Sequence, residues 1–465
     1  MARGPVKSGP NRAVPRLPQK PARNPIFRAM GTCMSQLLIN PERLWAAISQ
    51  LGRIGAYFCD DTQQFGVNRL ALTQADGQGR CHVLEKMRSL GLTVSIDRIG
   101  NVYGRRAGQR NDLSPVILGS HIDSVPTAGR FDGCLGVLGA LEIVETLNEA
   151  QSPTYRPLVV AFFTDEEGAR FGTDMLGSAV ATGRIGLEQA YALTDRDGLC
   201  VKDELRRLGF LGEVHEKLTP PHAYLECHIE QGPVLRKRHV DLGIVQGVQA
   251  ISWHKVTIVG KSAHAGTTPM ELRADASCAA SRINLQLREM TRSGHYGTSL
   301  RATMGAMFPT PGMVNIVPGK MLVTVDLRNP DDTLLSKAEA DLLDFCHQMS
   351  QQEGVTLTWQ QTARTQAVAF DAGLQRRIAH SAAHLGLSTA PIVSGAGHDA
   401  QEFARLCPTA MVFVPGELDG ISHNPREFST QEQCANGVNV LLHTALSVAN
   451  EFEAGPTGNV DPAKP

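Results

Sequence analysis

The feature that most constrains the fold is a stretch at 115–168, where two apolar runs are each followed at once by acidic or histidine side chains. The run 116–118 leads to His121 and Asp123, and the run 158–163 leads to three consecutive acids at 165–167. An apolar segment with helical spacing separates them. This order predicts a βαβ unit with parallel strands. Because ligands gather at the carboxyl ends of such strands, we expect these side chains to share one site.

Length, charge and cysteine usage narrow the class of protein. A chain of 465 residues predicts two or three domains. Its 45 basic and 46 acidic residues give a net charge of −1. This balance provides no large positive potential that would favour nucleic acid as a partner. No apolar run approaches the roughly 18–20 residues of a membrane span. Ten scattered cysteines without a C-x-x-C pair predict reduced thiols and a cytoplasmic protein.

The composition also divides the chain. Residues 1–38 are basic and proline-containing, with no acid before Glu42, and predict a disordered tail. Beyond residue 246 the elements follow a β-α-β-β-α-β order that resembles a ferredoxin-like insert. We therefore predict a catalytic α/β domain in two segments, an inserted domain between them and a loose tail at the end. The boundaries are 39–246 and 364–454 for the catalytic domain, 247–363 for the insert and 455–465 for the tail.

Five side chains are candidate metal ligands because they follow or interrupt short apolar strands or lie in a glycine-flanked loop. Imidazole and carboxylate groups suit zinc, manganese, cobalt or nickel better than a soft thiolate site would. Each residue alone has a structural alternative: an Asp can cap a turn, and an acid run can stabilise a helix N-terminus. Their shared position at strand ends favours a metal site. The candidates are His121, Asp132, Glu167, His228 and His423.

Five motifs that recur in order carry a resemblance to a known family. They are GSHIDSV at 119–125, GRFDGCLG at 129–136, TDEEGARF at 164–171, HIEQGP at 228–233 and GTTPM at 266–270. Together they resemble the carbamoylase-type (hydantoinase/carbamoylase) amidohydrolases, which comprise N-carbamoyl-L-amino-acid hydrolase, β-ureidopropionase and allantoate amidohydrolase. These belong to the wider group of two-metal aminoacylases and exopeptidases. The resemblance covers residues 41–451. It implies a mixed-sheet di-metal hydrolase domain with an inserted ferredoxin-like α+β lid and dimerisation domain.

The resemblance also implies roles for the candidate ligands. Asp132 would bridge two divalent ions, zinc first, with manganese, cobalt or nickel as alternatives. His121 and His228 would complete one metal site, and Glu167 and His423 the other. Two-metal hydrolases hold their ions roughly 3.5–4 Å apart with a water between them.

The resemblance further implies a base and substrate contacts. Glu166 would be the general base, and the Asp123 carboxylate would accept the second ring N–H of His121. His264 of the insert would reach the partner subunit's active site and stabilise the oxyanion. A carboxylate clamp and two weaker substrate contacts complete the predicted site. The clamp residues are Asn315 and Arg328, and the further contacts are Gln231 and His398.

The implied reaction is hydrolysis of the carbamoyl (ureido) C–N bond of N-carbamoyl-L-amino acids or N-carbamoyl-β-alanine, which gives amino acid, ammonia and carbon dioxide. The substrate would be a small ureido carboxylate, and the protein a homodimer through the insert, without membrane or nucleic acid. An allantoate- or ureidoglycolate-type amidohydrolase, or an aminoacylase, stays open as the alternative. A catalytically silent metal-binding protein would lack a ligand or the base, and none is missing. Asp165 departs from the family, which usually has Asn there.

Overall fold

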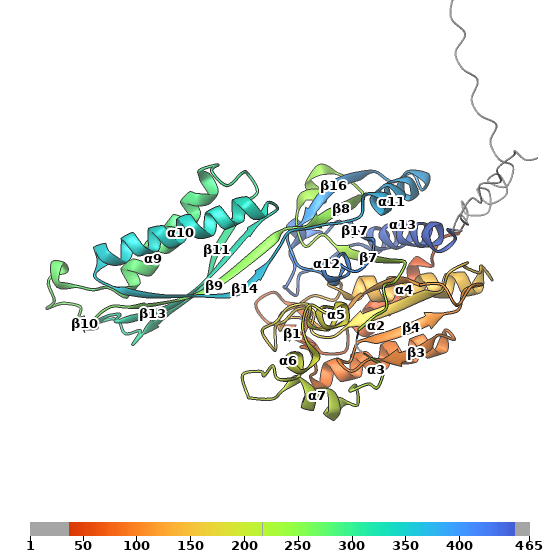
Figure 1. Cartoon of the computed structure of the whole chain (residues 1–465), viewed down its shortest axis with the longest axis horizontal. Coiled ribbons are helices and arrows are strands. Elements are labelled where there is room, and N and C mark those ends of the chain that lie inside the picture. Colours follow the sequence, from red (N-terminus) through yellow and green to blue (C-terminus); the bar gives the residue numbers. More distant parts are fainter. Residues whose placement is uncertain (1–36, 216, 452–465) are drawn as a thin grey trace, which may run out of the picture. The chain divides into compact units, whose positions relative to one another are not determined.

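A nine-stranded mixed sheet forms the centre of the main α/β unit in the computed structural model (Figure 1). The structure describes residues 37–215 and 217–451, so the predicted tails at 1–38 and 455–465 lie almost wholly outside the described residues. The sheet order is β15-β8-β17-β7-β5-β6-β4-β3, with β16 paired to β8. From Leu38 onward the chain forms one compact unit, so the boundaries between the catalytic segments and the insert stay predictions.

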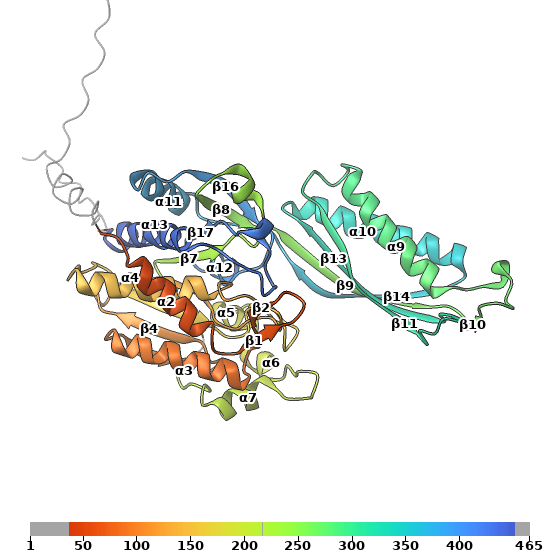
Figure 2. The ribbon, with the colours of Figure 1, turned by 180° about the vertical axis from the view of Figure 1, so that it is seen from behind.

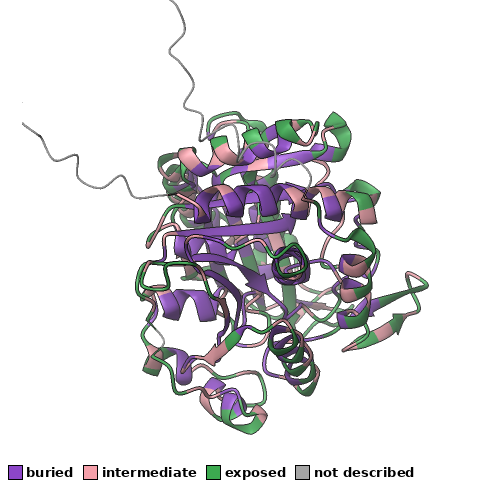
Figure 3. Cartoon of the chain, turned by 90° about the vertical axis from the view of Figure 1, so that its right-hand side faces the viewer, coloured by how far each residue is buried: buried purple, intermediate pink, exposed green. Residues whose placement is uncertain are grey.

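Four adjacent strands of this sheet run parallel: β17 (Thr409–Val414), β7 (Ala223–Ile229), β5 (Val116–His121) and β6 (Leu158–Phe163). Every residue in them is buried, and these buried strands can be followed in Figure 3. Parallel strands covered by helices on both faces read as continuous apolar runs, which explains the runs seen in the sequence. Their carboxyl ends therefore meet at one edge of the sheet, as the βαβ prediction requires.

The remaining elements flank this core. The other strands of the sheet are β3 (Thr93–Ile96), β4 (Val102–Arg106), β8 (Leu242–Val248), β15 (Val368–Ala369) and β16 (Thr389–Ser394), and β1 (Ala56–Cys59) and β2 (Gln64–Val67) form a separate hairpin. The helices are α2 (Pro41–Leu51), α3 (Gln74–Ser89), α4 (Cys134–Glu149), α5 (Leu176–Thr182), α6 (Leu187–Tyr191), α7 (Val201–Leu208), α8 (Val234–Arg238), α11 (Ala372–His384), α12 (Asp399–Phe403) and α13 (Gln431–Ala449), with 3-10 turns at Met270–Leu272 and Leu418–Gly420.

The insert has its own sheet and core. Strands β9 (Ala250–Val259), β11 (Arg301–Thr310), β13 (Lys320–Asn329) and β14 (Thr356–Thr365) form an antiparallel sheet in the order β11-β13-β9-β14. Helices α9 (Ala276–Arg292) and α10 (Asp332–Glu353) lie side by side against it (Figures 1 and 2). Its buried apolar cluster draws only on residues 250–355. The predicted β-α-β-β-α-β order is confirmed.

Helix α3 begins at Gln74, in a segment that contains Gly77 and Gly79, and glycine has a low helix propensity. The buried ion pair between Arg80 and Asp76, at 2.7 Å, stabilises that first turn. Asn40 caps helix α2, since its side chain accepts from the Arg43 amide at 3.0 Å. Among the described residues, no helix is both long and apolar enough to cross a membrane.

Candidate metal centre and active site

The fold brings all five candidate metal ligands to the carboxyl edge of the parallel strands. His121 is the last residue of β5, and His228 lies near the end of β7. Asp132 lies just before α4, where Gly133 adopts a positive φ of 66°. A Cβ at Gly133 would lie 2.4 Å from the His121 ring, so only glycine allows this approach. Glu167 and His423 lie in the loops after β6 and β17.

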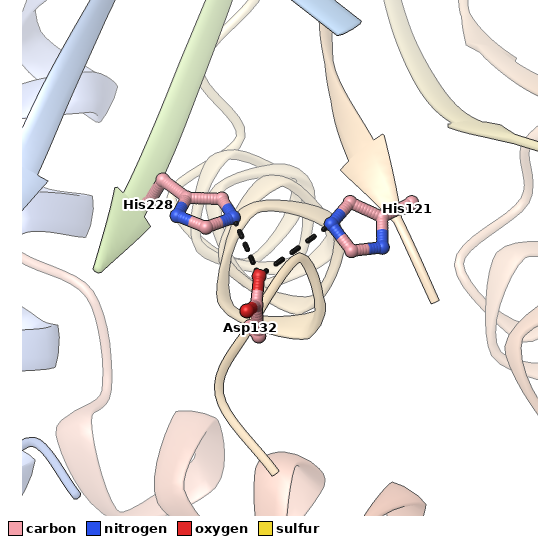
Figure 4. Close-up of side chains that lie close together, drawn as sticks. All are labelled: His121, Asp132 and His228. Carbon is pink, nitrogen blue, oxygen red and sulfur yellow. Dashed lines mark ion pairs between the residues drawn. The ribbon is translucent and has the colours of Figure 1, made fainter. Parts of the chain in front are cut away.

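Asp132 lies between two histidines through one of its oxygens. Its Oδ1 is 3.1 Å from His228 Nε2 and 3.6 Å from His121 Nε2, as the dashed lines in Figure 4 show. All three side chains are buried. These ligand atoms lie within 4.8 Å of one another, close enough to surround one ion.

The second carboxylate oxygen of Asp132 faces a second pair of candidate ligands, His423 and Glu167. Oδ2 is 3.4 Å from His423 Nε2, which is also 3.3 Å from Glu167 Oε2. These two carboxylates raise the pKa of the His423 imidazole to about 10. The two oxygens of Asp132 thus face two candidate ligand groups, and the bridging of two ions by Asp132 stays a prediction.

The hydrogen bonds around the histidines fit divalent cations. Nδ1 of His121 lies 3.0 Å from the Asp123 carbonyl, and Nδ1 of His228 lies 2.9 Å from the Ile229 carbonyl. If each Nδ1 donates its proton to that carbonyl, each Nε2 keeps a lone pair directed at Asp132. In addition, Oε1 of Glu167 is buried and has no hydrogen-bond partner within residues 37–215 and 217–451. Lone pairs and carboxylate oxygens that converge in this way suit zinc, manganese, cobalt or nickel.

Two residues that the sequence analysis missed hold the bridging carboxylate. Glu427 accepts from the backbone amides of Phe131 and Asp132 at 3.0 and 3.2 Å. Ser422 donates to Asp132 Oδ2 at 2.9 Å and also lies 2.7 Å from Glu427 Oε2. Glu427 carries no motif signal in the sequence, whereas Ser422 directly precedes the predicted ligand His423 and could have been suspected.

The predicted base, Glu166, lies beside these groups. Its Oε2 is 3.5 Å from His121 Nε2, and its side chain is 8% exposed. Burial raises the pKa of Glu166, and the neighbouring His121 opposes that shift. A carboxyl group whose pKa is raised binds a proton more tightly than an exposed carboxylate, which suits a general base.

The expected role of Asp123 is wrong in detail. The His121 ring lies against the backbone carbonyl of Asp123, whereas the carboxylate is 3.8 Å from that ring nitrogen. The carboxylate instead accepts from the backbone amides of Glu166 and Glu167, both at 3.3 Å. Because the amides of the turn after β6 donate to the Asp123 carboxylate, the His121 imidazole contacts the Asp123 carbonyl instead. Asp123 thus positions both the ligand His121 and the loop that holds the base.

Asp165 is buried, and among the described residues neither of its carboxylate oxygens has a hydrogen-bond partner. Burial and the nearby Asp123 raise the pKa of Asp165, which favours the neutral acid. An ionised Asp165 would add a negative charge where the family usually has a neutral Asn, but burial and the nearby Asp123 disfavour that ionised form.

A pocket opens over the ligand groups. Besides the ligands and Glu166, it is lined by Gln231, His398 and Arg328. Gln231 donates to Asp132 Oδ2 at 2.7 Å, and His398 lies 2.8 Å from the Ser394 hydroxyl. The Arg328 guanidinium is bonded to Asp326 and to the Gly395 carbonyl. The structure therefore brings these three predicted substrate contacts together.

The other two predicted residues of the insert lie elsewhere. His264 and Asn315 are exposed and sit on a short two-stranded pair, β10 (Ala263–His264) with β12 (Ile316–Val317) and the turn before it. The Asn315 carbonyl accepts from the Ala265 amide at 3.0 Å. Neither side chain lines the pocket of its own chain. Asn315 and Arg328 thus do not form one clamp within this chain.

Fold and site together define a hydrolase that uses divalent metal ions. Residues 117–447 match the family described as Peptidase family M20/M25/M40. The N-carbamoyl-L-amino-acid amidohydrolase of Rhizobium meliloti is 38% identical over 419 residues, covering 89% of this chain and 98% of that protein. The allantoate amidohydrolase of Bacillus subtilis is 33% identical over 386 residues, covering 83% and 93%.

Solved structures of the same family also resemble this chain. A hydantoinase/carbamoylase family amidase from Burkholderia vietnamiensis superposes with a TM-score of 0.83 at 40% identity, covering 90% of this chain and 99% of that one. The chain belongs to the peptidase family M20/M25/M40, and its resemblance to the carbamoylase-type amidohydrolases is confirmed. It is a hydrolase that acts on amide C–N bonds.

Proposed function

We propose that this chain hydrolyses the ureido C–N bond of N-carbamoyl-L-amino acids or N-carbamoyl-β-alanine. The observation that carries the proposal is the shared pocket, in which the Arg328 guanidinium faces the same space as Glu166 and the ligand groups around Asp132. A planar guanidinium can bind both oxygens of a carboxylate. A ureido acid offers that carboxylate a few bonds from the amide carbon to be attacked.

The chain's own residues supply the proton transfers and the orientation. Arg328 would exchange its Asp326 and Gly395 contacts for the substrate carboxylate, which fixes the ureido group over the ligands. Glu166 would take the proton of the attacking water and return it to the leaving nitrogen. Bound divalent cations would lower the pKa of that water and polarise the carbonyl. The residues that would hold them are His121, Asp132, Glu167, His228 and His423.

A homodimer through the insert belongs to the same proposal. Strand β11 is one of the two edge strands of the insert sheet and is largely exposed, and an unpaired strand edge is a template for a second chain. Nδ1 of His264 accepts from the amides of Gly266 and Thr267, at 3.0 and 3.2 Å. This arrangement leaves the Nε2–H of an exposed imidazole as a donor. Such a donor, placed in the partner's pocket, would stabilise a tetrahedral oxyanion.

Zinc is the cation we propose first, with manganese, cobalt or nickel as alternatives, because imidazole and carboxylate ligands suit all four. We further propose a cytoplasmic location. All nine cysteines within the described residues are free, as expected in a reducing compartment.

Ammonia release tests the proposal. The purified protein, supplied in turn with zinc, manganese, cobalt or nickel, is offered N-carbamoyl-L-amino acids, N-carbamoyl-β-alanine, allantoate and an N-acetyl amino acid. We expect ammonia from the carbamoyl acids, at the highest kcat/KM of the four groups. Faster turnover of allantoate would favour the ureidohydrolase alternative, and release of acetate from the N-acetyl compound would favour the aminoacylase. Absence of turnover on every ureido acid would contradict the proposal.

A further inference from the structure

The pocket over the ligand groups has lining residues that the proposed reaction does not use. Besides Arg328, it is lined by Ile251 and Trp253 of strand β9, which pairs with the strand of Arg328. It is also lined by Asp174 and Met175, from the segment before α5, and by Gly397. The same pocket thus holds a cation and an acid.

The Asp174 carboxylate is available to a ligand. Among the described residues, no side chain hydrogen bonds to it, and it accepts only from its own backbone amide. The two nearby guanidinium groups are engaged elsewhere: Arg184 donates to Glu402 at 2.8 Å, and Arg328 donates to Asp326 and Gly395. Both lower the pKa of Asp174 through space, against the burial that raises it.

The acid faces the interior of the pocket. A Cβ built on Gly397 would lie 3.9 Å from Asp174 Oδ2 and 3.3 Å from Met175 Cε. Since Gly397 lines the pocket, the carboxylate and the thioether border the same space. The absence of a side chain at this position keeps that space open.

The backbone fixes Asp174 relative to the base. The Met175 amide donates to the Glu166 carbonyl at 2.6 Å, and the Leu176 amide donates to the Asp165 carbonyl at 3.1 Å. Met175 has a φ of 52°, a conformation that a non-glycine residue holds only when its surroundings impose it. The Arg184 guanidinium also donates to the Asp174 carbonyl, at 3.5 Å. These contacts tie the backbone around Asp174 to the loop that carries Glu166.

We propose that Asp174 is a specificity-determining residue, whose carboxylate receives the hydrogen-bond donor or positive charge on the side chain of the amino-acid part of the substrate. The inference rests on the proposed ureido-acid hydrolysis. With the substrate carboxylate on Arg328, the side chain of the substrate would occupy the pocket that Asp174 also lines. A charge-assisted hydrogen bond in a partly buried site is strong, and two like charges there repel. The preferred substrates are thus carbamoyl derivatives of basic amino acids, and acidic ones are disfavoured.

A matched set of substrates tests this. N-carbamoyl-L-lysine and N-carbamoyl-L-norleucine have side chains of the same carbon length, and only the first ends in an ammonium group. N-carbamoyl-L-glutamate adds a carboxylate. The wild-type protein loaded with metal, the isosteric Asp174→Asn variant and an Asp112→Asn control at an exposed position are compared by kcat/KM on all three.

We expect the wild type and the control to prefer the lysine compound, and the glutamate compound to be poorest. Asp174→Asn should lower the lysine-to-norleucine ratio of kcat/KM by about tenfold or more. A far-UV circular dichroism spectrum and a metal content like those of the wild type report that the variant is folded. An unchanged ratio, with equal losses on all three substrates or none, overturns the role of Asp174 alone. Absence of wild-type turnover on these and every other ureido acid overturns the proposed function as well.

Discussion

At the residue scale, the chemistry of this site depends on the two oxygens of one carboxylate. Oδ1 of Asp132 faces His121 and His228, and Oδ2 faces His423. Burial alone would raise the pKa of Asp132, but the three imidazoles outweigh burial and hold it well below the usual range. The lowered pKa favours the ionised carboxylate, which can bind cations.

Glu166 lies next to the predicted ligand Glu167 but belongs to neither ligand group. Glu166→Gln should therefore retain the bound metal and lose about 10²–10⁴-fold in kcat, because the amide cannot accept the proton. Elemental analysis and ammonia release on the same sample measure both effects. Glu188→Gln, at an exposed position, is the control and should behave as wild type. Full activity in Glu166→Gln would show that another group is the base.

Asp97 predicts a pH effect on stability away from the active site. Burial raises its pKa from 3.8 to about 7, against hydrogen bonds from Asn101 and Tyr103. The folded protein holds this proton more tightly than the unfolded chain. Its stabilising contribution is therefore complete below pH ~4 and falls by about 1.4 kcal/mol per pH unit until pH ~7.

Asp97→Asn should remove this slope. Urea unfolding of wild type and variant between pH 4 and 8 measures the difference in unfolding free energy, which cancels the contribution of every other group. We expect the variant to gain relative to wild type as the pH rises. A difference that stays constant with pH would show that Asp97 is ionised in the folded protein throughout.

At the scale of elements, one buried arginine joins three segments of the metal centre. Arg69 donates to the Ile122 carbonyl between two site residues, and to the Leu51 and Ile54 carbonyls at the end of α2. It also lies 3.0 Å from the thiol of Cys134, at the start of α4. These contacts hold the loop after β5 and the start of α4 in a fixed relation.

Arg69→Lys should lower the unfolding free energy by about 3 kcal/mol, because an ammonium cannot reach the carbonyls of both segments and stays buried with unmet hydrogen bonds. Denaturant unfolding of the metal-free protein measures it. Arg53→Lys, at the exposed end of the same region, should lie within about 0.5 kcal/mol of wild type. If both variants unfold alike, the contacts of Arg69 do not contribute to stability as described.

The elements also show what a single sequence can and cannot reveal. The strands 116–118 and 158–163 and the helix between them were predictable because buried parallel strands are continuously apolar. Of the candidate ligands, His121 and Glu167 were predictable because they lie at or just after the ends of those strands. Glu427 was not, since its partners are backbone amides some 300 residues away in the chain. The contact of His121 with the Asp123 carbonyl, and not with the carboxylate, was not predictable either. It depends on the backbone amides of Glu166 and Glu167, which lie in another loop.

At the scale of the whole molecule, the exposed His264 predicts an active site that one chain cannot complete. A chain with His264→Ala and a chain with Asp132→Ala should each be nearly inactive. After unfolding and refolding together they should recover about a quarter of wild-type activity, because half of a statistical mixture is heterodimer with one complete site. Recovery is measured by ammonia release. Failure to complement would mean that the histidine acts within its own subunit or not at all.

The most direct test of the central claim is a metal titration of the chelated, metal-free protein, followed by ammonia release and by elemental analysis of the bound ion. The bridging position of Asp132 predicts two divalent ions per chain, with activity that reaches its plateau only at the second. Asp132→Asn should lose both ions together, since its two oxygens serve both ligand groups. A single ion at full activity, or an Asp132→Asn variant that still binds two, would contradict the account.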